Sequence, residues 1–272
     1  MLIAQITDTH IKANGRLAYG IVDTAGMLAN CVRHVMKLPR LPDAILLTGD
    51  LVDHGRPEDY ALLRDLLAPL TMPMYLVAGN HDERTALREA FSGPRFRYLE
   101  RTGEFLQYTV DLGPLRLIAM DTVVPGHGHG QLCEQRLAWL DARLAEDTRP
   151  ALIAMHHPPF VTGIAHMDAI GLLGGEGLEE ILHRHRHVER VVCGHLHRSI
   201  QCRFGGTAAS TCPSPAHQVA LDLQEDGPDC FAMEPPGYQL HLWKAGRLVT
   251  HTAVIGAYDG PYRFREGGQL ID

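Results

Sequence analysis

The sequence predicts an α/β protein in which buried parallel strands alternate with amphipathic helices. Short apolar runs separated by helical patterns fill the first half of the chain, which is the rhythm of a βαβαβ unit. With 272 residues the chain can form one large α/β domain, and 45% hydrophobic and 21% charged residues are ordinary for a globular protein. No run approaches the roughly 18 uninterrupted apolar residues that suggest a membrane span.

The elements of the first half follow from apolar runs and from helix-start signals. Pro57 stands in a first helical turn, and Glu58 and Asp59 follow it, where negative charge favours the positive end of the helix dipole. Strands are expected at residues 2–6, 44–48 and 74–78, and helices at 23–37, 57–70 and 85–91.

The second half continues the alternation and then changes character. A hairpin is expected from the strands 105–111 and 115–120, joined at Gly113 and Pro114. The further elements expected are helices at 134–145 and 177–186, strands at 151–155 and 188–193, and late antiparallel strands at 218–223, 238–243 and 247–254. Residues 224–237 are rich in proline, glycine and acidic residues, which predicts an exposed loop or small cap. We expect one domain over residues 1–272, with 198–260 supplying the late strands and a cap or oligomerisation segment.

Charge and cysteine content limit the possible partners. The net charge of −7 argues against a nucleic-acid polymer, because such binding normally needs a basic excess, and favours a small anionic substrate. The six cysteines include no CxxC pair, which argues against a cysteine-based zinc site and a disulfide framework. The first residues lack the pattern of a secretory signal, so we expect a cytoplasmic protein.

Five short polar motifs begin where expected strands end. They are Asp8-Thr9-His10, Gly49-Asp50, Gly79-Asn80-His81-Asp82, Met155-His156-His157-Pro158 and Gly194-His195-Leu196-His197. The carboxyl ends of parallel strands converge on one crevice, so these side chains are expected to meet. Each motif alone is more often an ordinary turn, but five of them in this order predict a single site.

The residue types in these motifs are metal ligands. Carboxylate, imidazole and amide oxygen suit divalent Zn, Mn, Fe or Co. In Asp-x-His and His-x-His, an extended backbone would place both side chains on the same face, so that each pair could hold one metal or lie between two.

This series of motifs resembles the calcineurin-like metallophosphoesterase superfamily over residues 8–197. Within it, the sequence is similar to bacterial class III cyclic nucleotide phosphodiesterases and to glycerophosphodiester phosphodiesterases. That similarity rests on Gly49-Asp50-Leu51-Val52-Asp53, on Gly55-Arg56-Pro57-Glu58-Asp59-Tyr60 and on His156-His157-Pro158-Pro159. The resemblance implies a four-layer αββα sandwich with a small C-terminal cap or dimerisation element, and a homo-oligomer, a dimer or larger.

The resemblance also implies a role for each residue. One metal would be held by Asp8, His10, Asp50 and His197, and the other by Asp50, Asn80, His156 and His195, with Asp50 bridging. His81 would act on the substrate as the catalytic residue, and Asn80 and His217 would join it in substrate binding. A water between the two metals would attack phosphorus in line as hydroxide. Asp82 is a candidate to orient His81.

Other histidines are interpreted as structural or solvated. His183, His185 and His187 stand at an expected helix end, where cationic side chains favour the dipole, and His127 and His129 are expected in a surface loop. We expect His157 to face away from His156. His54 stands where phosphoprotein phosphatases of the superfamily carry arginine, which argues against that branch.

The function expected is a dinuclear metal-dependent phosphodiesterase acting on a small 3',5'-cyclic nucleotide or glycerophosphodiester. The alternatives are a phosphomonoesterase or nuclease of the same superfamily, and a non-catalytic metal-binding interaction module. Extra arginines would favour a monoester and a basic groove a nuclease, and neither is evident in the sequence. The sequence leaves open the physiological substrate, the native metals, the oligomer size, and whether 224–237 covers the site or joins subunits.

Overall fold

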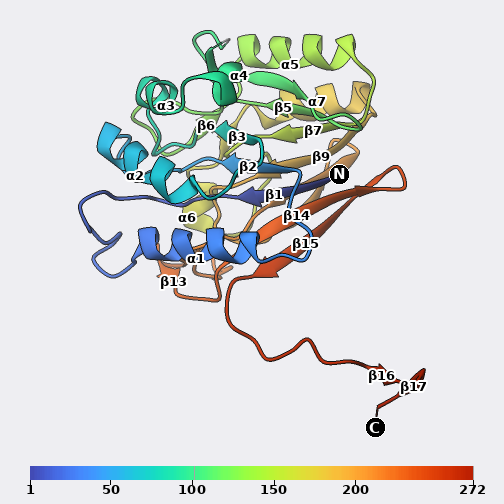
Figure 1. The fold of residues 1–272 in the computed structure, drawn as a ribbon. Coiled ribbons are helices and arrows are strands. Elements are labelled where there is room, and N and C mark those ends of the chain that lie inside the picture. Colours follow the sequence, from blue (N-terminus) through green and yellow to red (C-terminus); the bar gives the residue numbers. More distant parts are fainter. Residues whose placement is uncertain (101, 272) are drawn as a thin grey trace.

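Two mixed β-sheets lie face to face in the computed structural model, which describes residues 1–100 and 102–271 (Figure 1). The first sheet has the order β15-β14-β1-β2-β3 and the second the order β10-β11-β9-β7-β5-β4. Helices cover the outer face of each sheet, so the fold is the four-layer αββα sandwich that was expected. Figure 1 shows α1 beside the first sheet, and α5 and α7 beyond the second.

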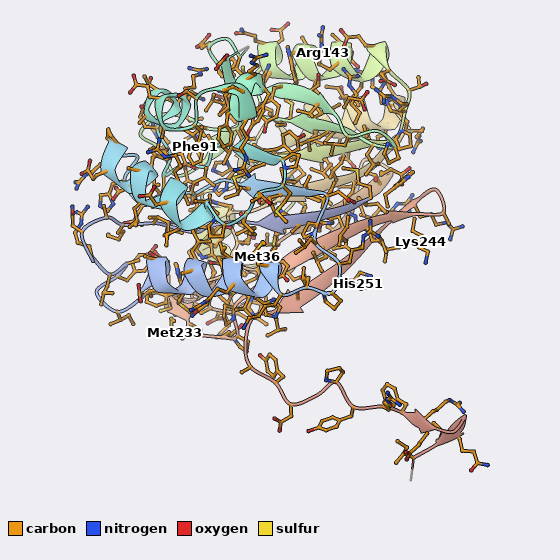
Figure 2. The ribbon with its side chains drawn as sticks, in the orientation of Figure 1. Met36, Phe91, Arg143, Met233, Lys244 and His251 are labelled. Carbon is orange, nitrogen blue, oxygen red and sulfur yellow. The ribbon has the colours of Figure 1, made fainter. Side chains whose placement is uncertain are left out.

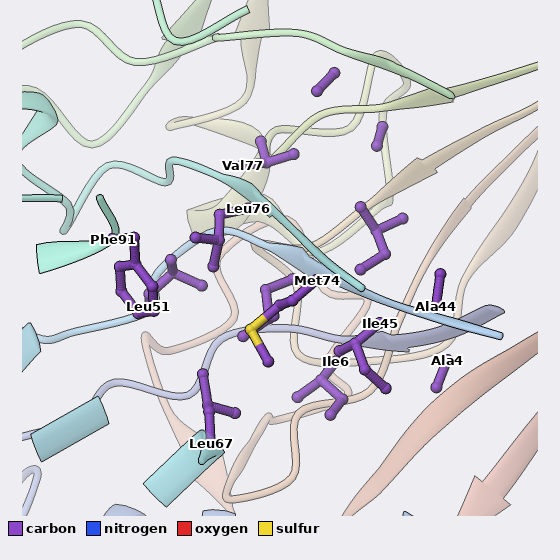
Figure 3. Close-up of a cluster of buried hydrophobic side chains, with 14 of the residues drawn as sticks. Ala4, Ile6, Ala44, Ile45, Leu51, Leu67, Met74, Leu76, Val77 and Phe91 are labelled. Carbon is purple, nitrogen blue, oxygen red and sulfur yellow. The ribbon is translucent and has the colours of Figure 1, made fainter. Parts of the chain in front are cut away.

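The first sheet joins the two ends of the fold. Strand β1 pairs in parallel with β2 and antiparallel with β14, so the late strands complete the sheet that the first residues begin. Its strands are β1 (Leu2–Ile6), β2 (Ala44–Thr48), β3 (Met74–Val77), β14 (Gly237–Lys244) and β15 (Arg247–Val254), and its helices are α1 (Thr24–Met36) and α2 (Pro57–Leu67). Figure 3 shows part of its core, where Ile6 and Ile45 lie near Leu67 of α2.

The second sheet is parallel at its centre and antiparallel at both edges. The expected hairpin is confirmed, since β4 pairs antiparallel with β5. Its strands are β4 (Tyr108–Asp111), β5 (Arg116–Ala119), β7 (Ala151–Ala154), β9 (Val188–Cys193), β10 (Gln201–Phe204) and β11 (Thr207–Thr211), and its helices are α5 (Glu134–Glu146) and α7 (Gly175–Arg184).

Alternating side chains of this sheet enter two different cores. Leu152 and Ala154 face the first sheet, whereas Ile153 packs with Leu140 of α5 and Leu182 of α7. Because both faces are covered, these strands are continuous apolar runs in the sequence.

Short elements connect the layers. They are α3 (Arg84–Ala90), η1 (Pro94–Phe96), α4 (Arg97–Glu100), β6 (Gly130–Gln131), α6 (Ala165–Asp168), β8 (Leu172–Leu173), β12 (Gln218–Val219), β13 (Phe231–Ala232), β16 (Arg265–Glu266) and β17 (Gln269–Leu270). Among the described residues, no helix has both the length and the apolar character needed to cross a membrane.

The sequence prediction was wrong at one late strand and missed two strands of the second sheet. The strand expected at 218–223 is only two residues long, because Leu221 and Leu223 point to solvent with 61% and 66% of their surface exposed. Strands β10 and β11 were not predicted, since their residues are small or polar and show no apolar run.

Candidate metal centre

The polar residues of all five motifs lie in loops at the carboxyl ends of strands. Asp8 and His10 follow β1, and Asp50 follows β2. The other predicted residues follow in the same way: Asn80 and His81 after β3, His156 after β7, His195 and His197 after β9, and His217 after β11. The strands of both sheets therefore deliver these residues to one end of the sandwich, as expected for parallel strands.

One group of side chains gathers around His10. Its Nε2 lies 3.2 Å from Nε2 of His197 and 3.7 Å from Oδ2 of Asp50, and Oδ1 of Asp8 lies 3.7 Å from Nε2 of His197. All four residues are buried. Asp8, His10 and His197 offer ligand atoms close enough together to hold a metal ion, and Asp50 lies beside them.

A second group shares Asp50. Oδ2 of Asp50 lies 3.3 Å from Nε2 of His156, which in turn lies 3.1 Å from Oδ1 of Asn80. The ring of His195 is 5.1 Å from that of His156, centroid to centroid. The same oxygen of Asp50 thus faces both groups, which is the position of a bridging carboxylate.

The hydrogen bonds of the histidines leave lone pairs pointing at one another. Nδ1 of His197 lies 3.1 Å from the carbonyl oxygen of His217, and Nδ1 of His156 lies 2.8 Å from that of Thr48. A carbonyl only accepts, so each Nδ1 donates, and each Nε2 carries a lone pair whenever its ring is neutral. Nδ1 of His10 likewise donates to Asp53, at 3.2 Å. Two lone pairs 3.2 Å apart repel each other unless a cation lies between them.

Burial has strong effects on the acid–base groups here. It raises the pKa of Asp8 to about 7, with His156 opposing the shift and Asp50 adding to it. Burial also acts to raise the pKa of Asp50, but attraction to His156 and His81 outweighs it and holds that pKa well below 3.8. Although burial opposes it, the charge of Asp50 raises the pKa of His156 to about 9. A bound divalent cation would supply a positive charge that the carboxylates of Asp8 and Asp50 both face, in place of the proton on His156.

The backbone of the ligand loops is not extended, which corrects the reasoning from sequence. Asp8, His10 and Asp50 have φ of 51°, 43° and 47°, and His195 and His197 have 70° and 50°. Residues other than glycine rarely adopt these left-handed φ values, and such backbone strain concentrates at functional sites. The pairs therefore converge through tight left-handed turns and not through the alternation of a strand.

His81 is held by Asp53 and not by Asp82, so the proposed orienting role of Asp82 was wrong. Nδ1 of His81 donates to the carbonyl oxygen of Asp53 at 3.0 Å, leaving Nε2 for a substrate. The carboxylate of Asp82 instead accepts from Tyr60 and from backbone N–H groups of the loops around it. The charge of Asp50 raises the pKa of His81, although burial opposes the shift.

Sequence reasoning gave Asp53 no role in the site. Its carboxylate accepts from Nδ1 of His10, and it also lies 2.6 Å from Nζ of Lys12 and 2.9 Å from Nδ1 of His54. Burial acts to raise its pKa, but the bonds from His10 and Lys12 hold it well below the usual range. The signal in the sequence was its place three positions after Asp50, within the motif Gly49-Asp50-Leu51-Val52-Asp53 that supports the family resemblance.

A cavity of about 400 Å³ opens over both groups. Its walls are His10, Tyr19, Asp50, Asn80, His81, Met167, Ile170, His195, His197, His217, Val219, Asp229, Cys230 and Phe231. His217 is 2% exposed, its Nδ1 has no hydrogen-bond partner among the described residues, and its ring lies 5.2 Å from those of Tyr19 and Phe231. No lysine or arginine stands among the described residues that line this cavity.

The histidines interpreted as structural lie elsewhere or are already bonded. The expectation that His157 faces away from His156 was wrong, since its ring lies 4.8 Å from that of His156 and 4.5 Å from that of His195. Both of its ring nitrogens nevertheless have partners, the Thr122 hydroxyl at 2.7 Å and the Gly128 carbonyl at 3.0 Å. His185 pairs with Asp141 at 2.7 Å. His129 lines a different cavity.

Known proteins resemble this chain over most of its length. The family model described as calcineurin-like phosphoesterase matches residues 1–199. A probable glycerophosphodiester phosphodiesterase, GpdQ, of Arcobacter nitrofigilis is 39% identical, covering 100% of both chains. A probable cyclic nucleotide phosphodiesterase of Rhodopseudomonas palustris is 37% identical over 96% of this chain and 94% of its own. In fold, a dimetal phosphatase from Danio rerio is similar with a TM-score of 0.68 at 17% identity, covering 94% of this chain and 98% of its own.

Proposed function

The chain belongs to the calcineurin-like phosphoesterase family, and on that premise we propose how its buried ligand groups hydrolyse small phosphodiesters. It is a phosphodiesterase, as its relatives are named. The observation that carries the proposal is the pair of ligand groups that share one oxygen of Asp50 beneath the cavity.

Each group would hold one divalent ion. Asp8, His10, Asp50 and His197 form the first set, and Asp50, Asn80, His156 and His195 the second. When bound, two such ions lower the pKa of a water between them and attract the phosphoryl oxygens. The nitrogen and oxygen ligands suit Fe, Zn, Mn or Co.

His81 and His217 would act on the substrate itself. The free Nε2 of His81 can donate a proton or a hydrogen bond to the leaving oxygen, a role favoured by its raised pKa. His217 lines the same cavity, and its buried Nδ1 has no hydrogen-bond partner among the described residues, which supports a role for it in substrate binding. Asn80 contacts His156 and lines the cavity, so its amide would serve both the second ion and the substrate.

The cavity favours a diester over a monoester. A diester carries one negative charge, whereas a monoester carries up to two and is commonly bound by arginine. The described walls contain no such cation and do contain Asp229. Both a 3',5'-cyclic nucleotide and a glycerophosphodiester meet this requirement, and the related phosphodiesterases carry both names.

Residues 224–237 are proposed to cover the site, because Asp229, Cys230 and Phe231 form part of its wall. We also propose a single domain over 1–272 and a homo-oligomer, a dimer or larger. All six cysteines are free, which supports a reducing compartment such as the cytoplasm.

Turnover of a chromogenic diester tests the function. Chelation should abolish it, and Mn or Co should restore it, whereas Asp50→Asn should lose both bound ions and about 1,000-fold or more in kcat. Activities on cyclic AMP, glycerophosphoethanolamine and a chromogenic monoester, with elemental analysis of the same sample, identify substrate and metals. If the protein holds two ions per chain but hydrolyses no diester, the result would support the alternative of a non-catalytic metal-binding interaction module. Faster turnover of the monoester would favour a phosphomonoesterase.

A further inference from the structure

A row of apolar side chains leads out of the reaction cavity along residues 219–223, here called the track. Val219, at its start, is buried and lines that cavity. Leu221 and Leu223 follow it and are 61% and 66% exposed to solvent. Three large apolar side chains therefore connect the inside of the cavity to the surface of the protein.

The hairpin of β12 and β13 holds the start of the track in place. Val219 pairs with Phe231, which also lines the cavity, and the backbone N–H of Ala220 donates to the carbonyl oxygen of Cys230 at 2.9 Å. Met233, just beyond β13, is labelled at the edge of the body in Figure 2. The track thus begins at a fixed cavity wall and continues at the surface.

The segment that contains α6 lies beside the track at both of its ends. At the inner end, Val219 belongs to one apolar cluster with Met167, which lines the cavity as well. At the outer end, a Cβ on Gly163 would lie 3.5 Å from Cδ2 of Leu223, and the nearby Val161 is 82% exposed. Track and segment together form an apolar strip, which is at most about 14 Å long because the track spans four peptide units.

The carboxylates next to this strip are engaged with other groups. Asp222, within the track, accepts from the backbone N–H of Gln224 at 2.9 Å. Oδ1 of Asp229, on the same hairpin, lies 3.5 Å from Nε2 of His166. The strip therefore favours hydrocarbon over a cation or a polar group.

The width of the strip favours a flexible chain over the surface of another protein. Exposed apolar patches mark places where something binds. A specific protein partner commonly buries about 800 Å² on each side, whereas Leu221, Leu223 and Val161 form a narrow row. Because the row continues the wall of the reaction cavity, the substrate itself is the molecule that can reach it.

We propose that the strip binds a hydrocarbon chain carried by one alcohol of the phosphodiester. This inference rests on the proposed function, because the phosphate must be held at the ligand groups beneath the cavity. A 3',5'-cyclic nucleotide has both ester bonds in one ring and carries no such chain. The favoured substrate class is therefore an acyclic, lipid-derived diester in which phosphate joins a small polar alcohol to an alcohol with one alkyl or acyl chain.

A series of chromogenic diesters that differ only in chain length tests the inference. The methyl, butyl and hexyl esters of 4-nitrophenyl phosphate all release the same nitrophenol, so their chemical reactivity is matched. In the Mn-loaded wild type, kcat/KM should rise about 2-fold for each added CH2 group, as expected for a chain half-removed from water. The increase from the methyl to the hexyl ester should then be about 30-fold.

The track variant Leu221→Ser, Leu223→Ser should lower the hexyl-to-methyl ratio of kcat/KM to about 5-fold or less, because it removes two side chains on which the chain packs. The control Leu41→Ser, Val249→Ser removes side chains before β2 and in β15 that are 44% and 43% exposed, and it should keep the ratio. The ratio compares two substrates of one protein, so a fraction of unfolded variant does not change it.

The outcomes separate this inference from the proposed function. Hydrolysis of neither ester would contradict the proposed function and with it this inference. Equal kcat/KM for the methyl and hexyl esters in the wild type, or the same ratio in wild type and track variant, would overturn the inference alone. A track variant that keeps the ratio but has a lower mass in sedimentation would assign the strip to a contact between copies, which also overturns it.

The variant Leu221→Trp reports whether the chain reaches the strip. Hexyl methylphosphonate, which has the single negative charge of a diester, should move the tryptophan emission to shorter wavelength because the indole ring loses contact with water. Methyl methylphosphonate should not, and the wild type supplies the background from Trp139 and Trp243. An unchanged emission at concentrations of the hexyl compound that inhibit diester turnover would refute binding of the chain at this place.

Discussion

The side chain of Asp53 fixes the geometry of a proposed metal ligand without belonging to either ligand group. The carboxylate accepts a hydrogen bond from Nδ1 of His10, and the backbone carbonyl oxygen of Asp53 accepts one from Nδ1 of His81. Carboxylates behind ligand histidines set which nitrogen faces the metal. Asp53 is therefore expected to act through both histidines.

Replacement of Asp53 by asparagine should weaken metal binding. The neutral amide no longer accepts strongly from His10 and Lys12, so the Mn dissociation constant should rise about 10-fold to 100-fold. Titration of the metal-free protein with Mn measures it. The control Asp111→Asn changes an exposed carboxylate that pairs with Arg149, and it should leave the affinity unchanged. Equal affinities for both variants would contradict this role.

Gly49 illustrates a constraint that composition does not reveal. Its φ is 93°, and a Cβ there would meet the ring of His156 and lie 2.9 Å from the Cα of Gly79. The ligand loops thus approach each other more closely than any side chain at this position allows. The sequence shows the glycine, but not the histidine that comes to lie against it.

Gly49→Ala should displace His156 and lower turnover about 100-fold, because a shift of about 1 Å at a catalytic site costs that much. Gly113→Ala is the matched control: its φ is 82°, also left-handed, but nothing lies within 4 Å of a Cβ there. It should lose about 1 kcal/mol of stability and keep its turnover. Comparable losses of turnover in the two variants would show that backbone strain, and not contact with His156, is responsible.

At the scale of elements, apolar runs located the buried strands and failed at the exposed ones. Strands β1, β2, β9 and β15 have the bounds that the sequence predicted. The prediction of a strand at 218–223 failed because alternation alone does not show which face of a strand will be covered. Leu221 and Leu223 are exposed in the structure. Tertiary contact, which decides such cases, is not readable from a local pattern.

Buried polar side chains tie the strands of the two sheets together. Nε2 of Gln5 in β1 donates to Oγ1 of Thr48 at 2.9 Å and to the carbonyl oxygen of Cys193 at 3.0 Å. Its Oε1 lies 2.9 Å from Nε2 of His241 in β14. The strands that end at Asp8, Asp50 and His195 are thereby held in a fixed relation to one another.

His241 should make stability fall in mild acid. Burial lowers its pKa to about 3 in the folded chain, whereas an exposed histidine has about 6.5. Between these values the unfolded chain binds a proton that the folded chain does not, so stability is lost as pH falls below 6.5. From pH 7.5 to 5.0 this amounts to about 2 kcal/mol.

The variant His241→Gln keeps hydrogen-bonding groups at this position and cannot titrate. Urea unfolding at pH 7.5 and 5.0 should show that its loss of stability over this range is smaller than the wild-type loss by about 2 kcal/mol. The same pH dependence in both proteins would mean that His241 is already protonated when folded.

Across the whole molecule, the site was more predictable than its surroundings. Each motif follows a parallel strand, and topology alone brings such strand ends together, so seven distant side chains could be placed at one centre. Tyr19 and Phe231 in the cavity wall could not be found in this way, because they come from loops whose path depends on packing. Their contact with His217 exists only in the folded chain.

Metal binding should raise the stability of the entire fold, in addition to enabling catalysis. The first ligand group places Nε2 of His10 and Nε2 of His197 3.2 Å apart in buried positions, and the folded chain carries the cost of their repulsion. A metal that binds this arrangement at 100 times its dissociation constant contributes about 2.7 kcal/mol per site. For a chain of this length, one such contribution corresponds to a melting temperature higher by about 5 °C.

Thermal unfolding with and without a chelator measures this difference. Asp50→Asn removes the carboxylate that both groups share, so its melting temperature should respond little to Mn or to the chelator. Strands β1 and β14, from the two ends of the fold, pair in the same sheet. Loss of the metals is therefore expected to lower the temperature of a single cooperative unfolding transition. A wild-type melting temperature that stays the same after complete metal removal would show that the ligand loops are held by the sandwich alone.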